Sequence, residues 1–124
     1  MPVLITLLCY AACTGIGYGL GCCNLAHILS RQRGFDIRTV GSQNPGASNT
    51  VITMGWRAGA AVCLHDIGKA FLASFLAGLL FPQLTLASVV GGAAAVLGHI
   101  FPATMGFRGG KGFAPYMGMI LALD

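Results

Sequence analysis

The chain has 124 residues, of which 56% are hydrophobic and only 8% are charged, and its net charge is +4. Soluble domains carry about 25% charged residues, so this composition excludes an ordinary water-soluble domain. The seven basic residues are scattered and form no stripe interleaved with aromatic residues, which argues against nucleic-acid binding. We therefore expect an all-α, polytopic membrane protein that forms a single membrane domain over residues 1–124.

The first predicted membrane helix spans residues 3–29, within a segment that contains no Asp, Glu, Lys or Arg. About 20 apolar residues suffice to cross the hydrocarbon core. No basic segment precedes this helix, which indicates an uncleaved membrane helix rather than a cleavable signal peptide. The loop that follows holds Arg31, Arg33 and Arg38.

A polar segment over residues 36–49 separates two strongly apolar stretches and is rich in glycine, serine and asparagine. Backbone N–H groups in such a segment can surround an anion, and Arg38 adds a positive charge. We predict that this first glycine-rich loop binds a phosphate group. The candidate ligands within it are Gly41, Ser42, Asn44, Gly46, Ala47 and Asn49.

The second predicted membrane helix runs from residue 56 to residue 80 and ends before Pro82. Asp66 and Lys69 are three residues apart, so they lie on one helical face, next to His65. Ionisable groups are costly inside a membrane and therefore indicate function, although a structural ion pair is the alternative. We predict that Lys69 binds phosphate and that Asp66 orients it.

The third predicted helix follows a turn over residues 81–84 and ends near Pro102, with His99 close to its end. A second glycine-rich loop follows, and its candidate phosphate ligands are Arg108, Gly109, Gly110, Lys111 and Gly112. It is not a nucleotide-binding P-loop, because Lys111 is followed by glycine and no strand precedes it.

The last apolar segment, residues 113–124, is about half a membrane crossing at 1.5 Å per residue. The sequence therefore predicts three full spans and a partial fourth, in a chain that we interpret as truncated. Because basic loops stay inside, the N-terminus is predicted to lie outside and both glycine-rich loops in the cytoplasm. The five cysteines show no spacing suited to zinc, so no metal or other cofactor is expected.

Four motifs, taken in order, resemble the bacterial acyl-phosphate:glycerol-3-phosphate acyltransferase (PlsY) family along essentially the whole chain. They are Asp-Ile-Arg (36–38) followed by Gly-Ser-Gln-Asn-Pro-Gly-Ala-Ser-Asn (41–49), Asp-Ile-Gly-Lys (66–69), Gly-His-Ile-Phe-Pro (98–102) and Phe-Arg-Gly-Gly-Lys-Gly (107–112). The resemblance implies an enzyme of the bacterial inner membrane that needs no cofactor. Its substrates would be acyl phosphate and glycerol 3-phosphate, its products lysophosphatidic acid and inorganic phosphate, and its role phospholipid synthesis.

By position, the resemblance implies that Arg38 and Lys69 neutralise charge, and that His99 contacts phosphate or acts as a base. The fourth residue of this predicted catalytic set is Cys22, which stands where the family commonly has the serine of Gly-Ser-Ile-Pro. A thiol is a poorer hydrogen-bond donor than a hydroxyl. The family also continues into further membrane helices, so we predict little or no transfer activity from the 124-residue chain alone.

Two other functions fit the composition: a non-catalytic membrane subunit, and a transporter of phosphate or a phospho-metabolite. Replacing Arg38 or Lys69 should leave such a subunit unaffected, and a transporter would show substrate flux without acyl transfer. The sequence predicts neither an oligomeric state nor an acyl-chain preference.

Overall fold

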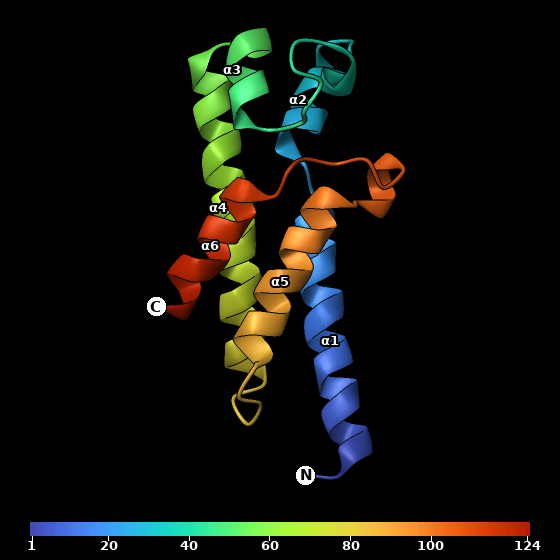
Figure 1. Cartoon of the computed structure of the whole chain (residues 1–124), viewed down its shortest axis with the longest axis vertical. Coiled ribbons are helices and arrows are strands. Elements are labelled where there is room, and N and C mark those ends of the chain that lie inside the picture. The colour runs from blue at the N-terminus through green and yellow to red at the C-terminus, as the bar shows by residue number, and fades with distance from the viewer.

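The computed structural model describes all 124 residues and contains α-helices and two short 3₁₀ helices but no strand, which confirms the all-α prediction. Three apolar helices run along the long axis of the molecule (Figure 1): α1 (Val3–Cys22), α4 (Trp56–Leu80) and α5 (Ala87–Ile100). Helix α5 packs against both α1 and α4, and α6 (Phe113–Leu123) packs against α4 and α5.

Shorter elements lie between these helices in the chain. At the end of the molecule opposite to the N-terminus lie α2 (Leu25–Gln32), η1 (Ile37–Thr39) and α3 (Ala47–Met54) (Figure 1). A second 3₁₀ helix, η2 (Ala103–Met105), follows α5. Helix α3 packs on α4, so the first glycine-rich loop is held close to the membrane helices.

Three segments are long and apolar enough to cross a membrane, namely Val3–Gln32, Trp56–Leu80 and Ala87–Met105, whereas Phe113–Leu123 is shorter. The prediction of three full spans and a partial fourth is therefore confirmed. The second predicted helix matches α4 at both ends, and its C-terminal end follows from the apolar run that stops just before Pro82.

The first predicted membrane helix, over residues 3–29, corresponds to the span Val3–Gln32 but is divided in two, because α1 ends at Cys22 and α2 begins at Leu25. Asn24 causes the interruption by capping α2: its side-chain oxygen accepts a hydrogen bond from the backbone N–H of His27 at 2.8 Å. The Asn24 amide also donates to the carbonyl of Pro45 at 3.1 Å. The break thus joins the first span to the first glycine-rich loop.

Small residues let α1 and α5 approach closely, which is typical of helix packing in membranes. A Cβ atom at Gly17 would collide with the carbonyl oxygen of Gly91, and one at Gly21 with that of Ala95. These glycines are therefore packing residues.

Candidate functional site

Helix α3 begins at Ala47, inside the segment predicted as a phosphate-binding loop, and its N-terminus is open. Gly46 is the N-cap residue and provides no side-chain cap. The N–H groups of Ala47, Ser48 and Asn49 make no backbone hydrogen bond, since the first such bond runs from Thr50 to Gly46. A helix end of this kind offers free donors and a partial positive charge.

Asn49 shapes the loop that leads into this helix. Its side chain is fully buried; the amide donates to the carbonyls of Ile37 (3.1 Å) and Val40 (3.0 Å). Its side-chain oxygen accepts from the N–H of Ser42 at 2.9 Å. Gly41 has a φ of 57°, and a Cβ there would collide with the same oxygen. Both residues hold the loop in shape, and a phosphate contact from them stays a prediction.

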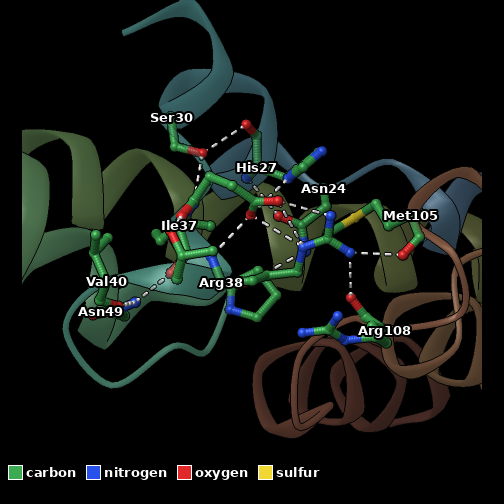
Figure 2. Close-up of polar contacts among 12 residues, drawn as sticks. Asn24, His27, Ser30, Ile37, Arg38, Val40, Asn49, Met105 and Arg108 are labelled. Atoms are coloured by element: carbon green, nitrogen blue, oxygen red, sulfur yellow. Dashed lines mark hydrogen bonds and ion pairs between the residues drawn. The ribbon is translucent and has the colours of Figure 1, made fainter. Parts of the chain in front are cut away.

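Arg38 ties the two glycine-rich loops together (Figure 2). Its Nη2 donates to Asp36 Oδ2 at 2.9 Å, while Nη1 donates to the carbonyls of Met105 (2.6 Å) and Arg108 (3.2 Å). The guanidinium hydrogen bonds hold the pKa of the Asp36 carboxyl well below its usual range, and the carboxylate raises the pKa of Arg38. We refer to Asp36, Arg38 and their acceptor carbonyls as the Arg38 clamp.

Helix α6 has an open N-terminus as well. Its N-cap residue is Gly112, which has a φ of 89° and provides no side-chain cap. The first intrahelical bond runs from Tyr116 N–H to Gly112. Pro115 has no N–H, so the free donors at this end belong to Phe113 and Ala114.

The two helix ends face one cavity of about 420 Å³. The first loop and α3 contribute Ser42, Asn44, Gly46 and Ala47 to its wall; the second loop and α6 contribute Lys111, Gly112, Phe113 and Ala114. The exposed ammonium group of Lys111 makes no ion pair within the protein. Two helix N-termini and a free cation around one cavity are chemically suited to bind an anion.

A buried polar cluster forms part of the wall behind this cavity, to which Asp66 and His99 contribute. Lys69 Nζ lies 3.2 Å from Asp66 Oδ1 and 2.8 Å from His99 Nδ1, and it donates to the carbonyl of Cys23 at 2.8 Å. The Lys69 side chain is only 4% exposed and does not line the cavity. Pairing with Asp66 lowers the cost of burying either charge.

The remaining predicted residues of the second loop lie away from the cavity wall. The Arg108 side chain is exposed, and its carbonyl belongs to the Arg38 clamp. Gly109 N–H donates to Ile100 at 2.9 Å and Gly110 N–H to the His99 carbonyl at 3.1 Å, so this part of the loop is fastened to the end of α5. Phosphate contacts from these three residues stay predictions.

Cys22 lines a different cavity, of about 320 Å³, together with Cys23, His27 and Thr104. Its carbonyl accepts a hydrogen bond from the Thr104 hydroxyl at 3.2 Å. The structure therefore separates Cys22 from the cavity between α3 and α6, and its predicted catalytic role stays untested.

The two open helix ends were not among the predicted features, because both N-cap residues are glycines rather than Ser, Thr, Asp or Asn. A signal existed: glycine is an acceptable N-cap residue, and each glycine is followed by a stretch of eight or eleven residues able to form a helix.

Comparison with known proteins places these features in a family. The family model for glycerol-3-phosphate acyltransferase matches residues 11–124. A glycerol-3-phosphate acyltransferase of Allorhizobium ampelinum is 40% identical over 122 residues, which cover 96% of this chain and 58% of the relative. A glycerol-3-phosphate acyltransferase of Clostridioides difficile is 40% identical over 114 residues, which cover 88% of this chain and 56% of the relative.

Two solved structures are similar, both of PlsY (YgiH), an integral membrane glycerol 3-phosphate acyltransferase. Its glycerol 3-phosphate form gives a TM-score of 0.85 at 32% identity and covers 93% of this chain and 57% of that chain. Its lysophosphatidic acid form gives a TM-score of 0.82 at 30% identity and likewise covers 93% of this chain and 57% of that chain. The chain thus spans a little over half the length of its relatives, and its fold is that of a multi-pass membrane protein.

Proposed function

The chain belongs to the glycerol-3-phosphate acyltransferase family, and we propose that it forms the phosphate-binding part of a phospholipid-synthesising membrane enzyme. In the proposed reaction, the 1-hydroxyl oxygen of glycerol 3-phosphate forms an ester bond with the acyl carbon as the acyl–phosphate bond breaks, and the departing phosphate takes up the hydroxyl proton. The products are lysophosphatidic acid and inorganic phosphate. The donor in this proposal is acyl phosphate itself.

The observation that carries this proposal is the cavity between α3 and α6. Both substrates carry phosphate groups, and the cavity combines two helix N-termini with the free ammonium group of Lys111. Acyl phosphate is already activated, so positioning and electrostatic stabilisation can supply much of the catalysis. The cavity wall offers both through fixed backbone donors.

The proposed location is the bacterial inner membrane, with the N-terminus outside and both glycine-rich loops in the cytoplasm. The basic residues support this orientation, because Arg31 lies at the end of the first span, Arg33 and Arg38 follow it, and Arg108 and Lys111 follow the third span. Glycerol 3-phosphate would then enter the cavity from the cytoplasm while the acyl chain stays in the bilayer.

The alternatives of a non-catalytic subunit or a transporter are not favoured, because the family and the solved neighbours are named as acyltransferases. Flux of glycerol 3-phosphate into vesicles without acyl transfer would restore the transporter hypothesis.

The test uses a chimera, because the chain covers 58% of a relative's length. Residues 11–124 would replace the matching segment of the Allorhizobium ampelinum protein, and membranes would receive labelled glycerol 3-phosphate with either acyl phosphate or acyl-CoA. We expect lysophosphatidic acid only with acyl phosphate. An inserted but inactive chimera, or one that uses acyl-CoA alone, would contradict the proposal.

A further inference from the structure

The Lys69 ammonium group has three partners within the protein. Its Nζ donates a hydrogen bond to the carbonyl oxygen of Cys23 (2.8 Å), forms an ion pair with Asp66 Oδ1 (3.2 Å), and lies at hydrogen-bond distance from His99 Nδ1 (2.8 Å). An ammonium group has three N–H donors and no lone pair. The three neighbours therefore match a protonated lysine, whose charge is balanced by the Asp66 carboxylate.

The same geometry determines where His99 carries its proton. An ammonium group can only donate, so Nδ1 of His99 must accept, and a neutral ring then has its proton on Nε2. Asp66 does not compete for an Nδ1 proton, because its Oδ1 lies 3.9 Å from Nδ1, beyond hydrogen-bond distance. The cluster of Asp66, Lys69 and neutral His99 has no net charge, as favoured within a membrane.

The Nε2 atom of His99 lies next to Gly110 of the second glycine-rich loop, and His99 itself contributes to the cavity wall. A Cβ atom on Gly110 would collide with Nε2, so glycine leaves room for the ring. Nε2 of His99 has no hydrogen-bond partner in the protein. It is nevertheless not fully enclosed, because the one enclosed side-chain polar atom without a partner is Nδ1 of His27. Since His99 is otherwise buried and contributes to the cavity wall, the cavity is the route by which a ligand would reach the Nε2–H.

We propose that Lys69 is a positioning residue that fixes His99 in its Nε2–H form, so that His99 donates a hydrogen bond to phosphate in the cavity. The inference rests on the proposed function of that cavity as a phosphate site. It assigns His99 the role of a donor rather than a general base. A base at Nε2 would need a free lone pair there, and accepting a proton would create an imidazolium beside the Lys69 ammonium group.

The first test reads the tautomer directly, by ¹⁵N NMR of histidine-labelled chain in detergent micelles, with His99→Gln to assign the signal. We expect unprotonated Nδ1 and protonated Nε2 in the native chain at neutral pH. The charge-neutral double variant Asp66→Asn/Lys69→Met should lose this single tautomer. Arg57→Gln, which removes an exposed cation from the same helix, should retain it.

An Nδ1–H tautomer or an imidazolium in the native chain would overturn the inference. This result comes from the spectrum of the native chain alone, so it does not require the double variant to fold. An unchanged tautomer in a folded double variant would also overturn it. Neither result depends on acyl transfer.

The second test adds glycerol 3-phosphate while calorimetry records its binding. We expect the Nε2 signal of His99 to shift on saturation and His99→Gln to weaken binding about tenfold, as for loss of one hydrogen bond to a charged group. Binding without any Nε2 shift would overturn the inference. If the chimera described above is still active, that result refutes the role of His99 while the proposed function holds.

Discussion

Lys111 and Arg38 are both cations of the glycine-rich loops, but their surroundings differ. The Arg38 guanidinium donates to Asp36 and to two backbone carbonyls, whereas the ammonium group of Lys111 is exposed at the cavity. At the residue scale, this difference separates a cation that holds the loops together from one that is free to meet a ligand.

We predict that Lys111→Met weakens binding of glycerol 3-phosphate about tenfold, because it removes a charge-assisted contact and keeps the apolar stem. Calorimetry on the purified chain in detergent would measure this, and the difference should shrink in high salt. Arg57→Met, which removes an exposed cation outside the cavity wall, is the matched control. Equal affinities of the Lys111→Met variant and the native chain would contradict the prediction.

The Arg38 clamp predicts a pH dependence of stability. Because the folded chain holds the pKa of Asp36 below its usual range, the ionised carboxylate stabilises the fold above its unfolded pKa of about 3.9. This contribution is lost as pH falls through the lower folded pKa. We expect Asp36→Asn to lower the free energy of unfolding by about 1 kcal/mol at pH 7, as for one partly exposed charged hydrogen-bond pair.

Below a pH of about 4, the difference between the native chain and the Asp36→Asn variant should narrow. Denaturant unfolding in detergent between pH 3 and pH 7 would measure it. A difference that stays constant down to pH 3 would show that the carboxylate is not held in its ionised form by the clamp.

At the scale of elements, the donors proposed to hold phosphate belong to helix ends rather than to loops. Ala47 is the first residue of α3, after Gly46 in an extended conformation with φ of −135° and ψ of −178°. Proline is tolerated at this helix position and follows an extended residue without clash. Ala47→Pro should therefore preserve α3 while removing one N–H from the cavity wall.

We predict that Ala47→Pro weakens binding of glycerol 3-phosphate several-fold and changes the unfolding midpoint little, because only an unpaired N–H is lost. Calorimetry and thermal unfolding would measure the two effects. Val3→Pro makes the same change at the first residue of α1, on an exposed side chain after the extended Pro2, and should leave binding unchanged. Full affinity in the Ala47→Pro variant would rule out the α3 end as a donor.

The elements also show what the sequence could predict. The C-terminal end of helix α4 was predictable because a long apolar run stops before Pro82. The break at Asn24 was not, because a single cap residue interrupts an otherwise apolar run. Helix α3 was hidden by its glycine cap. The Arg38 clamp was hidden because its distant acceptors, on Met105 of η2 and Arg108 of the second loop, are backbone carbonyls, which have no sequence signature.

At the scale of the whole molecule, the four motifs that carry the family resemblance do different work. The first loop and the end of the second meet at the cavity. The Asp66–Lys69 motif and His99 form the buried cluster behind it. Residues more than 60 positions apart, such as Ala47 and Phe113, share one wall only because α3 and α6 both pack on α4. The motifs therefore predicted which residues gather around the cavity, but they did not predict which atoms of those residues face a ligand.

The whole chain should separate binding from turnover. Residues at the N-termini of α3 and α6, together with Lys111, form the cavity wall. The chain nevertheless covers only 57% of the similar solved structure. We predict that the purified 124-residue chain binds glycerol 3-phosphate and yet forms little or no lysophosphatidic acid from acyl phosphate. The reason is that an anion site requires only fixed donors, whereas transfer requires both substrates to be aligned. Binding heat and product formation would be measured on the same preparation. Rapid product formation would show that the residues of this chain suffice for alignment, and absence of binding heat would refute the cavity as a phosphate site.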